Sequence, residues 1–136
     1  MKISIVLVVA AMLSGITAQN QEPIQDYVTV LQNAFDNQLS DYQIRGEGVV
    51  TRLLSDDLES AKHQRFILRI SSKQTVLVTH NIDIANRVSD LKVDSTVEFY
   101  GEYVWNVEGG IIHWTHHDPE NYHVDGWLKY NGVTYQ

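Results

Sequence analysis

Cysteine is absent from this chain of 136 residues, and its absence excludes several classes of protein. A disulfide-stapled scaffold, a thiolate zinc site, a cysteine nucleophile and an iron–sulfur cluster all require cysteine side chains. A lipid anchor on an N-terminal cysteine is excluded for the same reason. Stability must therefore come from a hydrophobic core, which a hydrophobic content of 43% is sufficient to build.

Positive charge is also scarce. Ten lysines and arginines stand against seventeen aspartates and glutamates, so the formal net charge is −7 at pH 7. A protein that binds nucleic acid non-specifically needs a positive surface that displaces counterions from the phosphates, so we expect no nucleic-acid partner. The sequence also lacks a Gly-rich phosphate loop, a serine nucleophile elbow and a His-Glu-x-x-His helix.

The N-terminal segment predicts export. Lys2 precedes an apolar run over residues 3–13, and small residues follow, with a candidate cleavage site between Ala18 and Gln19. The run is shorter than the ~20 apolar residues of a membrane-spanning helix; a buried N-terminal helix is the alternative. We expect residues 1–18 to be a signal peptide. Loss of Lys2 then changes the charge from −7 to −8, and the mature chain is periplasmic or extracellular, without a membrane anchor.

The mature chain divides into an N-terminal helix, within residues 19–42, and a β-rich domain over residues 43–136. Apolar residues from Ile24 to Leu39 recur at spacings of four and three, which predicts an amphipathic helix over residues 24–39. Apolar alternation and β-branched residues dominate the rest. Near the end, Asn131-Gly132 between two such segments predicts a hairpin.

The order of elements in the β-rich domain predicts an OB-like five-stranded barrel. The five strands are expected over residues 43–54, 64–70, 75–79, 95–104 and 111–115. A short helix over residues 81–91 would separate the third strand from the fourth. The N-terminal helix and the C-terminal hairpin would be additions to this fold, and other small barrels or open α+β sheets are the alternatives.

Four of the six histidines fall between residues 113 and 123. Imidazole and carboxylate groups are ligands for zinc and similar divalent metals. The candidate metal ligands are His113, His116, His117 and Asp118. On a regular strand His113 and His117 would lie roughly 13 Å apart, so a metal site requires the chain to bend after Thr115. Pro119 favours a bend because it cannot donate to a strand ladder.

The barrel prediction brings other polar residues to the same end of the domain. A two-residue turn between Ser71 and Gln74 would place His80 opposite Arg65. The third and fifth strands of an OB barrel run parallel, so both end at one pole. The candidate binding residues at this pole are His63, Arg65, His80, Asn81, Asp83 and Trp114. The alternative is a structural role, in which the histidines hydrogen-bond the backbone and close the barrel end.

The stretch His-Trp-Thr-His-His-Asp-Pro over residues 113–119 and the run Gly46-Glu47-Gly48 resemble segments of an uncharacterised family of small exported bacterial proteins. The resemblance extends from Gly46 to Gln136. It departs from the family at three positions where glycine is usual, which are Ser60, Lys73 and Asp94. The resemblance implies bacterial export and supplies no activity.

Three functions are compatible with the sequence. The first is a non-enzymatic module that binds a small ligand or a protein at the His/Asp-rich pole. The second is a metal-dependent hydrolase, such as a phosphodiesterase or nuclease, in which the His113–Asp118 cluster holds a divalent metal such as zinc and a metal-bound water attacks. The third is an envelope module that binds only proteins. We favour the first, and the pattern identifies no catalytic residue.

Overall fold

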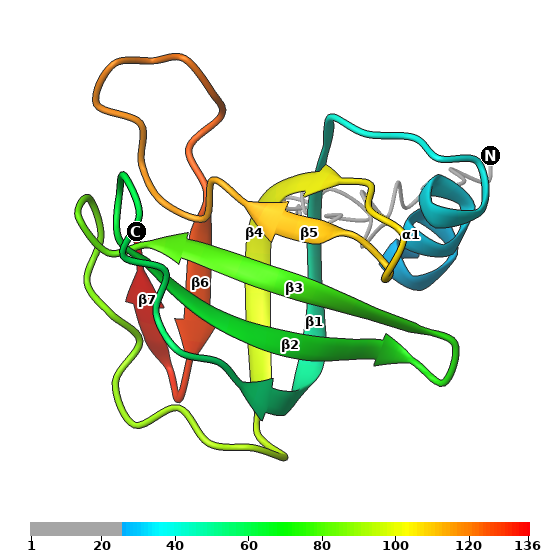
Figure 1. Ribbon diagram of the computed structural model, residues 1–136, viewed down its shortest axis with the longest axis horizontal. Coiled ribbons are helices and arrows are strands. Elements are labelled where there is room, and N and C mark those ends of the chain that lie inside the picture. Colours follow the sequence, from blue (N-terminus) through cyan, green and yellow to red (C-terminus); the bar gives the residue numbers. More distant parts are fainter. Residues whose placement is uncertain (1–25) are drawn as a thin grey trace, which may run out of the picture.

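A closed β-barrel forms the centre of the computed structural model, which describes residues 26–136 (Figure 1). Its strands are β1 (Tyr42–Leu53), β2 (His63–Ser71), β3 (Gln74–Asn81), β4 (Thr96–Val104) and β5 (Ile111–His113). The strands are neighbours in the order β1-β2-β3-β5-β4, and a β4–β1 pairing closes the barrel. Strands β3 and β5 run parallel, so the predicted OB-like order is confirmed.

Alternating side chains fill the barrel. Phe66 and Leu68 are fully buried, whereas Ile67 between them faces outward and is partly exposed. The same period of two places Val97, Phe99 and Gly101 of β4 inside. The apolar core therefore belongs to the barrel interior.

Helix α1 (Tyr27–Asp36) is shorter than the predicted helix. It begins after Asp26, whose carboxylate accepts a hydrogen bond from the backbone N–H of Thr29. It ends because Gln38 adopts a left-handed conformation, with φ of 53°, and Leu39 N–H turns back to the Ala34 carbonyl. The predicted signal peptide lies outside the described residues. Within residues 26–136, no helix has the length and hydropathy needed to cross a membrane.

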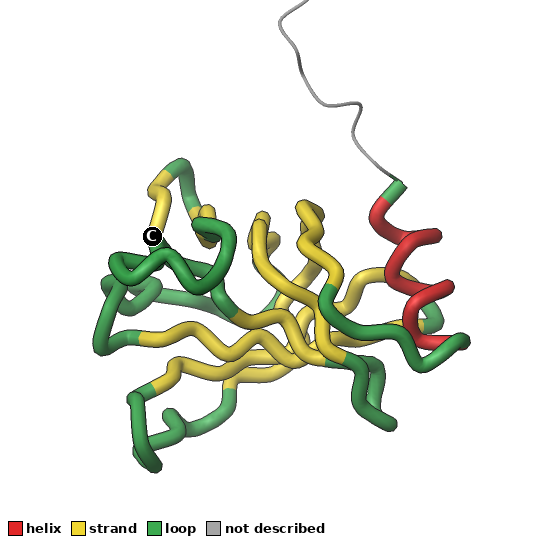
Figure 2. The backbone as a smooth tube through the Cα atoms, turned by 90° about the horizontal axis from the view of Figure 1, so that it is seen from above, coloured by secondary structure: helices red, strands yellow, loops and turns green. Residues whose placement is uncertain are grey.

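Helix α1 covers one end of the barrel (Figure 2). Its carbonyls at Leu31 and Phe35 accept hydrogen bonds from Gln74, where β3 begins, and from Trp105, just after β4. Gly46 of β1 permits this approach, because a Cβ there would lie 2.7 Å from the ring of Tyr27. The long loops lie at the opposite end, where β3 and β5 finish.

A C-terminal hairpin of β6 (Trp127–Tyr130) and β7 (Val133–Tyr135) extends the sheet next to β4. Its turn residues Asn131 and Gly132 have φ values of 49° and 75°. Two successive positive φ values are typical of the type I′ turn that Asn-Gly favours. The predicted hairpin is confirmed.

The predicted short helix over residues 81–91 is wrong. Asn81 does start one turn, since its side chain accepts hydrogen bonds from Asp83 and Ile84. The turn does not propagate, because buried side chains from other strands bind the next backbone groups. Gln64 hydrogen-bonds both the N–H and the carbonyl of Val88. The segment is a loop that covers the barrel end with buried Ala85 and Val88.

The predicted pairing of His80 with Arg65 is also wrong by one residue. Ser71 pairs with Gln74 as expected, but an irregularity between Arg69 and Ser71 shifts the rest of the ladder. His80 therefore lies opposite Gln64, and the two side chains are both buried.

Candidate functional site

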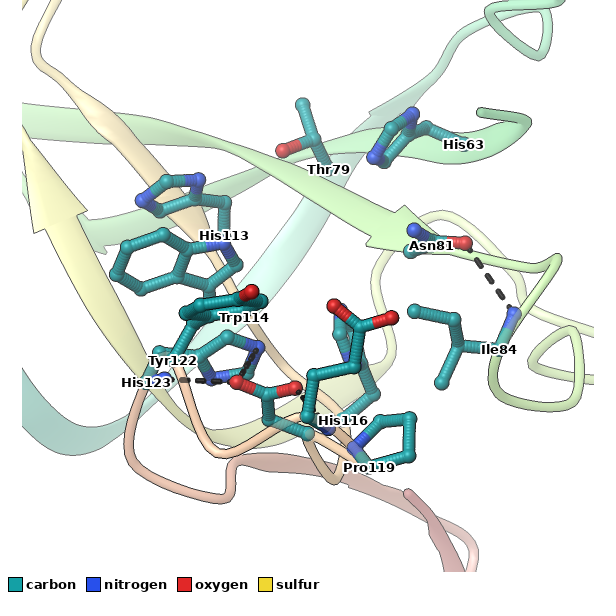
Figure 3. A pocket seen from close by; sticks show the side chains of 12 residues that line it. His63, Thr79, Asn81, Ile84, His113, Trp114, His116, Pro119, Tyr122 and His123 are labelled. Carbon is teal, nitrogen blue, oxygen red and sulfur yellow. Dashed lines mark hydrogen bonds and ion pairs between the residues drawn. The ribbon is translucent and has the colours of Figure 1, made fainter. Parts of the chain in front are cut away.

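The barrel wall opens at the end opposite α1. Strand β5 pairs with β3 only at Leu77 and Val78, whereas β3 runs on to Asn81 without a strand on that side. A cleft of about 540 Å³ lies there (Figure 3). We call it the histidine cleft, because four of the six histidines line it. These are His63, His113, His116 and His123.

A sharp bend at Trp114 creates one wall of the cleft. Trp114 has a φ of 53°, and the strand ends at His113, two residues earlier than the bend expected after Thr115. The following loop closes on itself where Gly126 N–H donates to the His116 carbonyl, at 2.9 Å. A Cβ on Gly126 would lie 2.0 Å from the Trp114 carbonyl oxygen, so only glycine fits this closure.

Trp114 itself is a scaffold side chain. Its ring stacks between His113, at a centroid distance of 4.5 Å, and His123, at 4.6 Å, with interplanar angles of 15° and 5°. Both faces of the indole are therefore covered, and it offers no free face on which a sugar or base could stack. His113 is further held by Glu102, whose carboxylate oxygen lies 3.2 Å from His113 Nε2.

Three histidines of the cleft are oriented in the same way, by a hydrogen bond from Nδ1 to a backbone carbonyl. The Nδ1 atoms of His63, His116 and His123 lie 2.9, 2.7 and 2.8 Å from backbone carbonyl oxygens. A carbonyl can only accept, so each Nδ1 carries a proton, and the Nε2 of a neutral ring is then a hydrogen-bond acceptor. The Nε2 atoms of His63 and His116 have no hydrogen-bond partner among residues 26–136, so they are free to accept from a ligand.

Asp118 organises the loop around the cleft. Its carboxylate accepts from the backbone N–H groups of Glu120 and His123, and its Oδ2 lies 3.8 Å from His123 Nε2. Burial works to raise the pKa of Asp118, but these backbone hydrogen bonds outweigh it and hold the pKa below the ordinary 3.8. Asp118 is therefore ionised near neutral pH, with much of its hydrogen-bonding capacity already used.

His80, a predicted binding residue, is fully buried behind the cleft. Its Nε2 donates to the Asn86 carbonyl at 3.0 Å, and its Nδ1 accepts from the hydroxyl of Thr115 at 2.8 Å. Burial lowers the pKa of His80 to about 4, so the ring is neutral. With both nitrogens bonded, His80 joins β3 to two loops. The sequence pattern did not indicate Thr115, whose buried hydroxyl completes this contact.

The other predicted binding residues separate into two groups. His63, Asn81 and Trp114 line the histidine cleft. Arg65 and Asp83 do not: Arg65 donates to the Ser55 carbonyl, and Asp83 accepts from the backbone N–H of Lys62.

The four predicted metal ligands do not converge on one point. His113, His116 and Asp118 line the cleft, whereas His117 is exposed and its Nε2 lies 2.9 Å from the side-chain oxygen of Gln136. Among the residues that the structure describes, no three His, Asp or Glu side chains are grouped so that they could hold a metal ion. The metal site stays a prediction from the sequence pattern.

The cleft also contains residues that sequence reasoning did not select. Glu120 and Tyr122 line its outer rim, and the Tyr122 side chain is 82% exposed. Their position in the sequence could have indicated them. Both lie in the loop that follows Asp118-Pro119, and exposed loops on a β-barrel often carry binding residues.

The chain belongs to a family whose activity is not assigned. A family model described as "Protein of unknown function (DUF3465)" matches residues 11–136, which extends upstream of the resemblance that began at Gly46. No curated protein and no solved structure matches the chain significantly.

Proposed function

We propose that this member of the DUF3465 family is an exported, non-enzymatic binding module that takes a small ligand into the histidine cleft. The volume of about 540 Å³ falls within the range of small-molecule sites. The ends of β2, β3 and β5 contribute His63, Thr79, Asn81 and His113 to the lining, and the loop after β5 contributes most of the rest. OB-type barrels commonly use such loop-bordered surfaces for ligands.

The observation that carries this proposal is the pair of free imidazole acceptors. His63 and His116 lie far apart in the sequence, yet both line the cleft with Nδ1 bound to a carbonyl. His116 is only 3% exposed, but its Nε2 is not among the fully buried side-chain atoms that lack a partner. This nitrogen therefore opens to the cleft, where a ligand that brings a hydrogen-bond donor can reach it.

The lining supports binding more than catalysis. It contains no serine, cysteine or lysine, and the hydroxyl of Thr79 forms no hydrogen bond with a histidine or carboxylate of residues 26–136 that could activate it as a nucleophile. The Asp118 carboxylate already accepts two backbone hydrogen bonds, so it is poorly placed to activate a water.

The test is a titration followed by ¹H–¹⁵N NMR. The purified protein is mixed in turn with a diamine, a diol, a dicarboxylate and a phosphate monoester. We expect at least one compound to shift the amide signals of residues 113–123 saturably. Thr79→Trp should abolish the response by filling the cleft. Thr75→Trp is the matched control, because Thr75 is exposed on the same strand and does not line the cleft.

Two results would overturn the proposal. The first is that none of the four compounds shifts the amides around the cleft. The second is that Thr79→Trp, with the barrel signals unchanged, binds as well as Thr75→Trp.

A further inference from the structure

The charge around the histidine cleft is one-sided. Residues 93–128 form β4, β5 and the loop that borders the cleft, and they contain no lysine or arginine. Seven acidic residues lie in the same stretch. They are Asp94, Glu98, Glu102, Glu108, Asp118, Glu120 and Asp125. Of these, Asp118 and Glu120 line the cleft, while Glu98 lies 4.0 Å from Arg45 in an ion pair. The charge that this wall places at the lining is therefore negative.

Of the positive side chains close in sequence to the opposite wall, Arg65 and Arg87 are engaged elsewhere, whereas Lys62, next to His63, is exposed and does not line the cleft. Arg65 and Arg87 line a separate depression of about 220 Å³. Arg87 forms an ion pair with Asp56 at 2.6 Å, and Arg65 donates to a backbone carbonyl. No lysine or arginine lines the histidine cleft, so nothing at its lining balances the carboxylates of Asp118 and Glu120.

Glu120 is the carboxylate most available to a ligand. It is exposed at the rim, and its side chain forms no ion pair or hydrogen bond with any residue in the range 26–136. Glu120 follows Pro119, which Figure 3 labels, and both residues line the cleft. A cation entering the cleft would therefore meet a free negative charge before it reached the histidines.

The buried end of the cleft selects for hydrogen-bond donors. His116 Nε2 is an unpartnered acceptor on a side chain that is 3% exposed. Burial is the largest of the effects that lower the pKa of His116, and the neighbouring imidazoles of His123 and His63 act in the same direction. The ring is therefore neutral near pH 7, and a ligand group facing Nε2 must bring its own proton.

Tyr122 adds an aromatic surface at the rim. Its ring is 82% exposed and lines the cleft. An aromatic face attracts an organic cation through the ring quadrupole, whereas it gives no such attraction to an anion.

We propose that the ligand of the histidine cleft is a small organic cation with protonated primary amines. The ammonium groups donate to Nε2 of His63 and His116, while Glu120 and Asp118 supply the opposite charge. This inference rests on the proposed function and adds the ligand class to it. A neutral polyol could donate the same hydrogen bonds to Nε2 but would lack the positive charge. A carboxylate or phosphate is itself a hydrogen-bond acceptor and would face the Nε2 acceptors and the carboxylates of Glu120 and Asp118.

The experiment compares three four-carbon probes that differ in their end groups, namely butane-1,4-diamine, butane-1,4-diol and succinate. Binding is measured by ¹H–¹⁵N NMR and calorimetry at about pH 7.5, at low and at high salt. We expect the diamine to bind in the cleft at least about tenfold more tightly than the diol. Its affinity should fall with salt, since screening weakens exposed charge pairs. Succinate should not bind.

Glu120→Gln tests the charge without disturbing the fold, because Glu120 is exposed. It should weaken diamine binding roughly threefold or more, as the loss of a partly exposed charge pair does. Glu108→Gln is the control. Glu108 is also an exposed acid of residues 93–128, but it does not line the cleft. It should bind as the wild type does.

The outcomes distinguish this inference from the proposed function. Cleft binding of the diol or of succinate as tight as that of the diamine would overturn the cationic ligand and leave the binding module standing. Equal diamine affinity in Glu120→Gln and Glu108→Gln would also overturn it. If neither these probes nor the compounds of the wider titration shift the amides around the cleft, the proposed function fails as well.

Discussion

The Nδ1 atom of His80 accepts a hydrogen bond from the hydroxyl of Thr115 at 2.8 Å, in the fully buried interior of the barrel end. The same ring donates through Nε2 to the Asn86 carbonyl. One side chain therefore fixes the end of β3, the loop after it and the first turn beyond β5. These are the segments that border the histidine cleft, so this contact supports the geometry of the site.

Replacing Thr115 by valine tests this contact. Thr115→Val keeps the side-chain shape and removes the hydroxyl, so His80 Nδ1 is left buried without a donor. We expect a loss of about 1–3 kcal/mol in the free energy of unfolding, the usual cost of an unsatisfied buried group. Urea unfolding measures it. Thr134→Val, at an exposed position of β7, should be neutral, and equal stability of the two variants would show that the His80 contact contributes nothing.

Stability should fall as the solution is acidified from neutral pH. His80 has a pKa of about 4 in the folded protein and an ordinary value of 6.5 when unfolded. The unfolded state therefore binds the proton first, and the contribution of His80 is complete above pH 6.5 and is lost as the pH falls towards 4. The full difference corresponds to about 3 kcal/mol. The lowered pKa of His116 acts in the same direction.

Urea unfolding at about pH 7.5, 6 and 5 checks this dependence. NMR provides a direct control, because the ring signals of His80 should not titrate between about pH 7 and 5.5 while the protein is folded. A stability that rises on acidification over this range, or a His80 ring that protonates near pH 6.5, would contradict the buried neutral imidazole.

The barrel could be predicted from the sequence because local signals agree with the tertiary structure. Apolar alternation around Phe66 and Leu68 identifies a half-buried strand, and Asn131-Gly132 identifies a hairpin. The loop after β3 could not be predicted, since Asn81 does give a helix-start signal. The helix fails because Gln64, far away in the sequence, binds the backbone of Val88.

The site could be predicted only in part, because some of its geometry follows from strand topology and the rest from tertiary contacts. Parallel β3 and β5 end at one pole, and the antiparallel β2–β3 pairing places His63 opposite Asn81 at that pole, so the topology brings His63 and His116 to one cleft. The left-handed backbone of Trp114 is a tertiary effect, since tryptophan has no preference for positive φ. Because this bend could not be predicted, the stacking of Trp114 between two imidazoles could not be predicted either. The same holds for the exposure of Tyr122 at the rim.

Export is tested by the fate of the N-terminal segment. If the predicted signal peptide operates, the chain expressed in a bacterial cell should leave the cytoplasm and begin at Gln19, because residues 3–13 have the length and apolar character of a signal-peptide core. Mass spectrometry of the fractionated cells measures both properties. Val8→Arg should block export by interrupting the apolar core, whereas Gln21→Arg, beyond the cleavage site, should not. An uncleaved cytoplasmic product from the wild-type gene would contradict the signal peptide.

The adjacent histidines His116 and His117 should respond differently to substitution. His116 is 3% exposed and packs edge-on against His123, with ring centroids 5.1 Å apart. His116→Ala should therefore cost roughly 1–3 kcal/mol of stability, as the loss of a buried, hydrogen-bonded side chain does. His117 is exposed, so His117→Ala should be close to neutral. Thermal unfolding of both variants measures this, and equal effects would mean that the loop does not depend on the buried ring.

A zinc titration decides between binding of an organic ligand and the hydrolase alternative. A catalytic zinc site needs three protein ligands around one ion, and His117 lies away from the cleft that His113 and His116 line. We expect calorimetry of the chelator-treated protein to show no tight one-to-one zinc binding and no thermal shift. Stoichiometric binding that disappears in His116→Ala, while His117→Ala retains it, would instead favour a metal site within the cleft. In that case the free Nε2 atoms of His63 and His116 would be its first ligands to test.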